Sequence, residues 1–146
     1  MPDSPRTAVP PRVLLVDDHP LFLEGLRNLL TSEGIEVVGL AKDGLEALAQ
    51  ARRLRPDVIL MDIQMPVMDG LEATRRIKEQ WPEIRVVVLT LYARYQVKAL
   101  ESGADLFLLK GCTPQVLQDA ILAQQHIQQI RPDAGEQAEN TVDGPN

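Results

Sequence analysis

Five side chains that could hold a cation or a phosphoryl group directly follow four apolar runs of this sequence. Asp17 and Asp18 come after the first run, and Asp62, Thr90 and Lys110 come after the three later ones. Carboxylate oxygens favour hard divalent ions, and Mg²⁺ typically takes one or two carboxylates together with water and phosphate oxygens. If these side chains share one site, their types predict Mg²⁺ binding beside a place where a phosphoryl group can sit.

The charges of this group would balance around a cation. Three ionised carboxylates, one ammonium group and one Mg²⁺ sum to a formal charge of zero (−3 + 1 + 2). Mg²⁺ and Lys110 could then offset the charge of a phosphoryl group, and Thr90 could donate a hydrogen bond to it. Asp62 is the candidate acceptor, with an aspartyl phosphate as the product. The simpler alternative for each residue alone is a turn, a strand end or a surface lysine, and only their joint placement favours a site.

Five short runs rich in β-branched residues or leucine predict the strands that would position these side chains. All but the second are continuously apolar, as is typical of strands covered on both faces. The gaps between them carry helical patterns, which predicts right-handed crossovers and a parallel sheet. The predicted strands span 13–16, 36–40, 58–61, 86–89 and 106–109, and the predicted helices span 21–30, 45–54, 71–79, 94–102 and a last segment that opens at Thr113-Pro114.

The polar side chains meet only if the first and third strands are neighbours. That requires an α/β fold of the flavodoxin-like kind, a doubly wound five-stranded parallel sheet in the order 2-1-3-4-5 with five helices. Ligands of such sheets bind at the carboxyl ends of the strands, where the strand order reverses.

Two helix starts carry the same five residues. Asp43 to Ala47 and Asp69 to Ala73 both run Asp-Gly-Leu-Glu-Ala, 26 positions apart. In each, the Asp can accept from free N–H groups while the Glu three residues later bonds back, which is a capping box. We interpret the pair as two independent caps rather than as a sequence repeat.

Composition and charge exclude several classes of protein. The chain has 146 residues and a net charge of −6, which argues against a basic nucleic-acid surface. Its apolar runs are far shorter than the roughly 20 residues that span a membrane. The lone Cys112 can form no internal disulfide, so we expect a cytoplasmic protein. Proline-rich residues 1–11 predict a flexible arm and polar residues 131–146 a disordered tail, which leaves one domain over 12–130.

The two histidines and the cysteine have ordinary explanations. His19 is expected in the loop that leads into the first helix, and His126 on a solvated helix face. Cys112 has no flanking base, so no catalytic role is expected for it.

Four ordered segments of the chain closely resemble the receiver domain of two-component response regulators. They are 13–20 (VLLVDDHP), 61–70 (MDIQMPVMDG), 88–90 (VLT) and 108–110 (LLK). The resemblance covers 12–130. It implies that a sensor histidine kinase phosphorylates Asp62, that Asp17, Asp18, Asp62 and the backbone carbonyl of Gln64 hold Mg²⁺, and that Thr90 and Lys110 contact the phosphoryl group. Phe107 occupies the aromatic switch position of the family, although packing in the core is the better explanation for it.

The chain departs from the family pattern at three places. Phe107 is often Tyr in the family, so a switch here would lack the hydroxyl group. Gly111 replaces a frequent Pro, so a trans peptide bond is expected there. Residues 92–95 are less acidic than is usual for the family.

The resemblance implies a signalling role rather than an enzymatic one. Phosphorylation would bias the surface formed by the fourth helix, the fifth strand and the fifth helix toward a downstream protein or a second copy of the chain. Neither direct nucleic-acid binding nor membrane association is expected of this chain. The motif at 17–20 with Lys110-Gly111 is similar to the nitrate-response subgroup, so one alternative is the receiver portion of a regulator whose helix-turn-helix domain is missing from this chain. A Mg²⁺-dependent phosphatase is a third hypothesis, but Gln64 stands where such chemistry usually has a second acid.

Overall fold

The structure is a computed structural model that describes residues 9–123. The predicted tail at 131–146, the end of the last helix up to 130, His126 and most of the predicted arm at 1–11 lie outside the described residues.

Five parallel strands form one sheet in the order β2-β1-β3-β4-β5, as the sequence predicted. Each pairing is parallel, and Val16 lies beside both Ala41 of β2 and Met61 of β3. The order therefore places β1 and β3 side by side. The strands are β1 (Arg12–Val16), β2 (Glu36–Ala41), β3 (Val58–Met61), β4 (Arg85–Thr90) and β5 (Leu106–Leu109).

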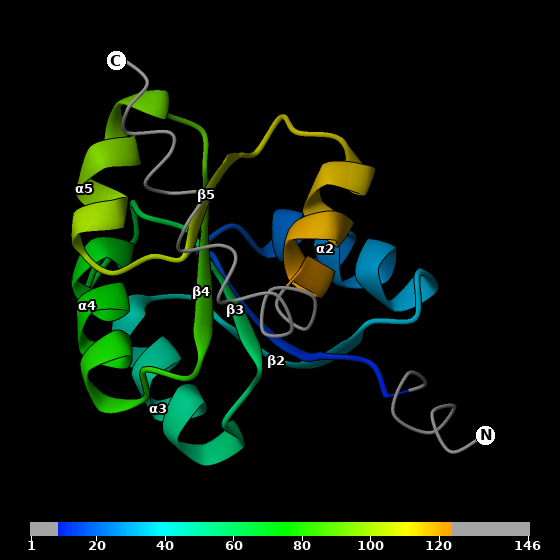
Figure 1. The fold of residues 1–146 in the computed structure, drawn as a ribbon, viewed down its shortest axis with the longest axis horizontal. Helices are drawn as coiled ribbons and strands as arrows, with labels where there is room; N and C mark the ends of the chain where they lie inside the picture. Colours follow the sequence, from blue (N-terminus) through cyan, green and yellow to red (C-terminus); the bar gives the residue numbers. More distant parts are fainter. Residues whose placement is uncertain (1–8, 124–146) are drawn as a thin grey trace, which may run out of the picture.

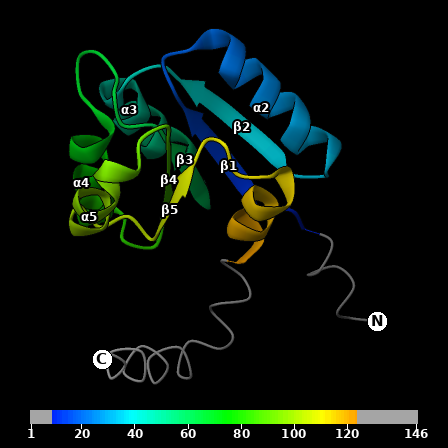
Figure 2. The same ribbon diagram turned by 90° about the horizontal axis from the view of Figure 1, so that it is seen from above.

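Within residues 9–123, five α-helices cover the two faces of the sheet (Figures 1 and 2). One face carries α2 (Pro20–Ser32) and the last helix (residues 114–123), and the other carries α3 (Gly44–Leu54), α4 (Gly70–Gln80) and α5 (Gln96–Glu101). Each face has its own apolar core. Leu26 and Ile121 lie in the first, and Ala51 and Ile77 lie in the second. The three central strands are buried almost completely, which explains their continuous apolar runs.

The expected element bounds differ from the observed ones by one or two residues at several ends, and three differences concern α2, α5 and β4. Helix α2 begins at Pro20, since proline suits the first turn, and it continues two residues beyond the predicted end. The predicted helix 94–102 is a 3₁₀ turn, η1 (Ala93–Tyr95), followed by the short α5, and neither start has a side-chain cap. Thr90 is the last residue of β4 rather than the residue after it.

The two predicted helix caps form, but not as reciprocal boxes. The Asp43 carboxylate accepts from the Glu46 N–H at 2.8 Å, and that of Asp69 accepts from the Glu72 N–H at 2.9 Å. Glu46 bonds back to the N–H of Lys42, one residue before the cap. Glu72 instead pairs with two arginines of its own helix, since each lies within one turn of it.

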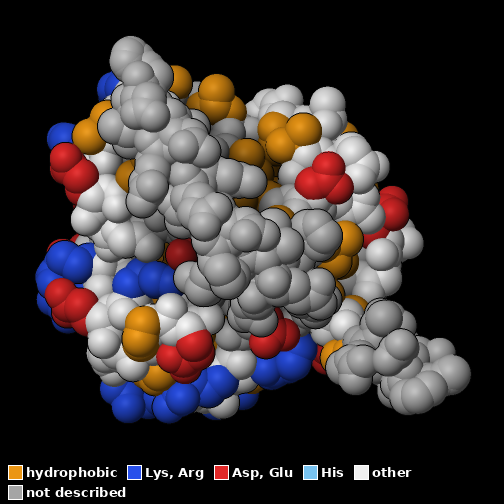
Figure 3. All heavy atoms as spheres, in the orientation of Figure 1, with side chains coloured by type: hydrophobic (Ala, Val, Ile, Leu, Met, Phe, Trp, Pro, Cys, Tyr) orange, Lys and Arg blue, Asp and Glu red, His pale blue; other side chains and the backbone are white. Residues whose placement is uncertain are grey.

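Basic side chains gather along one edge of the molecule, over α3 and α4, and acidic side chains lie among them (Figure 3). Arg52 and Arg55 stack over the ring of Trp81, with guanidinium carbons 5.6 and 5.2 Å from its centroid. No helix within residues 9–123 has both the length and the apolar character needed to cross a membrane.

Candidate metal-binding and phosphorylation site

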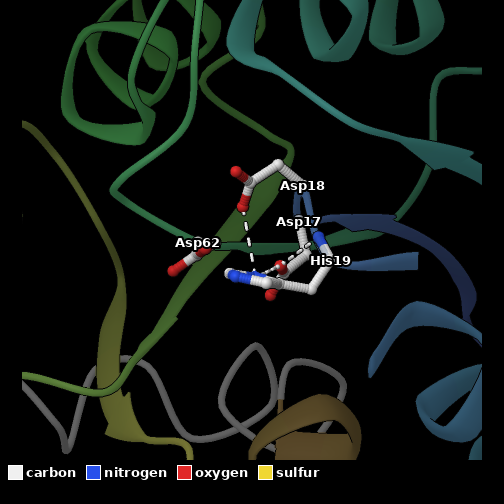
Figure 4. A group of neighbouring side chains, drawn as sticks. All are labelled: Asp17, Asp18, His19 and Asp62. Carbon is white, nitrogen blue, oxygen red and sulfur yellow. Dashed lines mark hydrogen bonds and ion pairs between the residues drawn. The ribbon is translucent and has the colours of Figure 1, made fainter. Parts of the chain in front are cut away.

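The carboxyl ends of β1, β3, β4 and β5 bring the predicted site residues together. Ligand oxygens of Asp17, Asp18 and Asp62, with a nitrogen of His19, all lie within 4.8 Å of one another (Figure 4). The Lys110 Nζ lies 2.7 Å from Asp17 Oδ2 and 3.5 Å from Asp62 Oδ2. The sheet order and the strand register bring these side chains together, because neighbouring parallel strands place their carboxyl ends at the same edge of the sheet.

Burial makes this cluster electrostatically costly. Asp17 and Asp62 are only 2% and 5% exposed, and their combined negative charge faces one lysine. Burial raises the pKa of the Asp62 carboxyl above its usual value, and the charge of Asp17 raises it further, while Lys110 opposes both. Clustered carboxylates of this kind are stabilised by a cation. The donor set consists of oxygens with one imidazole, and it fits a divalent ion such as Mg²⁺.

Thr90 places a hydroxyl group at the end of the strand beside β3. Its side chain is 1% exposed, and its Oγ1 has no hydrogen-bond partner among the described residues. A buried hydroxyl without a partner costs free energy, so it is suited to a ligand that supplies an acceptor.

Lys110 is held by two neighbours. Asp17 is the nearer of its two carboxylate partners, and the Lys110 Nζ also lies 4.5 Å from the centroid of the Phe22 ring, a cation–π contact from α2. Phe22 was not among the predicted site residues, although its position in the first turn of α2 beside the acidic pair was a usable signal. The ammonium group is therefore fixed close to Asp62, although Asp17 is its nearer partner.

The segment after β3 is fixed to the starts of two helices. The Gly44 N–H donates to the Met68 carbonyl and the Gly70 N–H to the Ile63 carbonyl, both at 2.8 Å. A Cβ atom at Gly70 would lie 1.8 Å from the Asp62 carbonyl oxygen, so only glycine permits this approach. The glycines after the two capping aspartates thus hold the segment that follows Asp62, at the same places where α3 and α4 begin.

His19 lies closer to the acidic group than the sequence suggested. It is the residue before α2, as predicted, but its Nδ1 lies 2.8 Å from Asp17 Oδ1 and 3.2 Å from Asp18 Oδ1 (Figure 4). The hydrogen bond to Asp17 raises the pKa of the His19 imidazole, and the negative charge of Asp18 raises it further. The available signal was its place directly after the two aspartates.

The side chains of Gln64 and Phe107 both contact neighbouring elements. The Gln64 side-chain amide donates to the Tyr95 hydroxyl at 2.9 Å, which links the segment after β3 to the start of α5. Phe107 is half-buried and packs against the core on the α3–α5 face, as does Tyr95. The carbonyl of Gln64 as a ligand and Phe107 as a switch stay predictions.

Arg94 lies in the segment after Thr90 that is less acidic than is usual for the family. Its guanidinium carbon lies 4.5 Å from the centroid of the Tyr92 ring and 4.9 Å from that of Tyr95. The two rings also contact each other edge to face. This exposed cation–aromatic group follows directly on the end of β4.

Comparisons with known proteins agree with this geometry. Residues 13–122 match the family model described as "Response regulator receiver domain". The response regulator protein VraR of Staphylococcus epidermidis is 43% identical over 113 residues, which cover 75% of this chain and 54% of that protein. VraR of Staphylococcus aureus is 42% identical with the same coverage. The chain therefore spans about half the length of the curated relatives it matches.

Solved structures give the same result. A two-component response regulator of the LuxR family from Aurantimonas sp. superposes with a TM-score of 0.75 at 36% identity, covering 79% of this chain and 84% of that one. The signal receiver domain of the putative response regulator NarL from Mycobacterium tuberculosis gives a TM-score of 0.73 at 37% identity, covering 77% and 94%. With its strand order, its acidic group and these matches together, the chain belongs to the family of response regulator receiver domains.

Proposed function

We propose that Asp62 accepts a phosphoryl group from a sensor histidine kinase, in a reaction supported by Mg²⁺ at the neighbouring carboxylates. The observation that carries this proposal is the placement of the buried Asp62 carboxylate 3.5 Å from the Lys110 ammonium and beside the Asp17–Asp18 pair. Asp17, Asp18, Asp62 and the Gln64 backbone carbonyl would hold the ion.

The chemistry is an in-line phosphoryl transfer. An Asp62 carboxylate oxygen attacks the phosphorus of a phosphohistidine, the P–O bond forms as the P–N bond breaks, and the electron pair leaves with the imidazole nitrogen of the donor. Mg²⁺ supplies charge neutralisation at the phosphoryl oxygens when it is bound. Lys110 offers a cation at the same place, and the Thr90 hydroxyl offers a hydrogen-bond donor without a competing partner.

Phosphorylation would be transmitted through the residues that hold the phosphoryl oxygens. Thr90 ends β4 and Lys110 follows β5, and the Lys110 N–H donates to the Thr90 carbonyl at 2.8 Å, so the two positions are linked. The adjoining surface exposes apolar side chains, with Leu91, Val97 and Leu109 exposed by 61%, 65% and 40%. We infer that α5, β5 and the last helix form the face that a downstream protein or a second copy contacts.

Labelling by a small phosphodonor such as phosphoramidate tests the acceptor. The wild-type chain in Mg²⁺ is expected to take up phosphoryl groups, and Asp62→Asn is expected to lose essentially all of this labelling because the amide is not a nucleophile. Asp119→Asn, which changes an exposed aspartate on the last helix, is the matched control and should label as wild type. Labelling of Asp62→Asn at the wild-type rate would contradict the assignment, and chelation of Mg²⁺ should slow the wild-type reaction.

A second candidate is the receiver portion of a DNA-binding transcription regulator. It is favoured because the chain covers only 54% of its VraR relatives. A DNA-binding response regulator of the LuxR family from Staphylococcus aureus also superposes with a TM-score of 0.73 at 25% identity. A coding sequence that continues past Asn146 into a helix-turn-helix would select this candidate.

We infer that the chain does not turn over phosphomonoesters. Such hydrolysis needs an acid near Asp62 to protonate the leaving group, and the Gln64 amide at the expected position instead donates to Tyr95. Steady release of phosphate from assorted monoesters would contradict this inference.

A further inference from the structure

We propose that the His19 imidazole is a direct ligand in the metal site and shifts its preference from Mg²⁺ toward divalent transition ions such as Mn²⁺ and Co²⁺. This inference rests on the proposed function, because it concerns the same site. An oxygen-only site favours Mg²⁺, whereas an imidazole nitrogen adds affinity along the series from Mn²⁺ to Co²⁺ and beyond.

The His19 Nδ1 lies at the spacing of neighbouring octahedral ligands from one oxygen of each of two aspartates. With bonds of about 2.1 Å, neighbouring ligand atoms of an octahedral ion lie about 3.0 Å apart. The His19 Nδ1 lies 2.8 Å from Asp17 Oδ1 and 3.2 Å from Asp18 Oδ1. One ion could therefore contact the imidazole nitrogen together with an aspartate oxygen.

The orientation of Asp17 keeps the required oxygen available. Its Oδ2 faces the Lys110 Nζ at 2.7 Å, and its Oδ1 faces His19. Its Oδ1 also accepts from the His19 backbone N–H at 2.9 Å, which fixes the main chain of residue 19 beside the carboxylate. Lys110 therefore neutralises one oxygen while the other stays directed at the imidazole.

The surroundings also point to a ligand that is not a protein group. The Thr90 hydroxyl, 1% exposed, has no partner among residues 9–123, and Asp62 is 5% exposed. The His19 side chain, by contrast, is 63% exposed, so its ring can adjust to an entering ion without disturbing the core. The buried acids supply the charge, and His19 supplies an adaptable nitrogen at the rim.

A hydrogen-bond role for His19 makes the opposite prediction. If the ring only donates to Asp17 and pairs with Asp18 as a cation, it competes with every metal ion, and its removal should increase the affinity for Mg²⁺ and Co²⁺ alike. If it is a ligand, its removal should weaken Co²⁺ binding selectively.

Calorimetric titration of the untagged full chain with Mg²⁺ and Co²⁺, in a Cys112→Ser background, separates the two roles. His19→Ala is expected to weaken Co²⁺ binding roughly tenfold or more and to change Mg²⁺ binding by less than about threefold. His126→Ala removes the other histidine of the chain and should leave both affinities unchanged. Pulsed electron paramagnetic resonance of the Mn²⁺ form should show coupling to an imidazole nitrogen in wild type and in His126→Ala, but not in His19→Ala.

The outcomes distinguish this inference from the proposed function. An unchanged Co²⁺-to-Mg²⁺ affinity ratio in His19→Ala, an increase in both affinities, or no nitrogen coupling in wild type would overturn the role of His19 alone. Absence of any divalent binding by the wild-type chain would overturn the metal site as a whole.

Discussion

The three aspartates of the site differ in what surrounds them. Asp17 is held between Lys110 and His19, one oxygen toward each. Asp18 keeps a side chain that is 31% exposed, which suits it to share an ion with water. Asp62 is buried, and Lys110 lies nearer to Asp17 than to it. Of the two buried aspartates, the one farther from the Lys110 ammonium is thus the one assigned as the acceptor.

Asp62→Asn is expected to raise the melting temperature in metal-free buffer at neutral pH by a few degrees, because it removes a buried charge that is only partly compensated. The raised pKa means that the folded state binds the Asp62 proton more tightly than the unfolded state. The wild-type penalty is therefore full above the folded-state pKa and disappears below the ordinary value of about 4.

Scanning calorimetry of both proteins between neutral pH and about pH 4 measures this difference in melting temperature. The difference in melting temperature should shrink as the pH falls toward 4, and saturating Mg²⁺ should also reduce it by stabilising the wild type. A difference in melting temperature that depends on neither pH nor Mg²⁺ would show that the charge of Asp62 does not destabilise the fold.

At the scale of elements, the segment between β3 and α4 is held by hydrogen bonds to the starts of two helices. It runs past the starts of α3 and α4 and is fixed by the N–H groups of Gly44 and Gly70. Val67 within it has a φ of 71°, a left-handed conformation that a β-branched residue seldom adopts. The segment that carries Gln64 is therefore shaped by its neighbours rather than by its own preferences.

Gly70→Ala is expected to lower the free energy of unfolding by about 1–3 kcal/mol or more, because the new Cβ would overlap the Asp62 carbonyl. Gly25→Ala in α2 is the matched control, since nothing lies within 4 Å of its added Cβ, and it should stabilise the chain by up to about 1 kcal/mol. Denaturant titration of both variants measures these changes. Equal effects of the two substitutions would contradict the close approach of Gly70 to Asp62.

The sequence was sufficient to predict the strands and the acidic site, but not the contacts within it. Continuous apolar runs mark buried parallel strands, and the side chains after them must meet at one edge once the order is known. The pairing of Lys110 with Asp17 and the Phe22 contact depend on how α2 leaves β1, which no local pattern encodes. The 3₁₀ turn after Thr90 was missed because no capping side chain marks where it begins.

At the scale of the whole molecule, one sheet connects the site to the proposed output surface. The strand order places the acids between β1 and β3, and it extends through β4 to the edge strand β5, beside which exposed apolar residues lie. The residues proposed to sense the phosphoryl group, Thr90 and Lys110, stand on the two strands that lead to that edge. The fold thus provides a short route from Asp62 to the α5–β5 face.

Chemical mapping of the phosphorylated residue tests the central claim most directly. After reaction with a phosphodonor in Mg²⁺, borohydride reduction converts an aspartyl phosphate into homoserine, and peptide sequencing by mass spectrometry locates it. We expect homoserine at position 62 alone, with a strong decrease when Mg²⁺ is chelated. Homoserine at position 17 or 18, or at several aspartates regardless of Mg²⁺, would contradict the assignment of Asp62 as the phosphoryl acceptor.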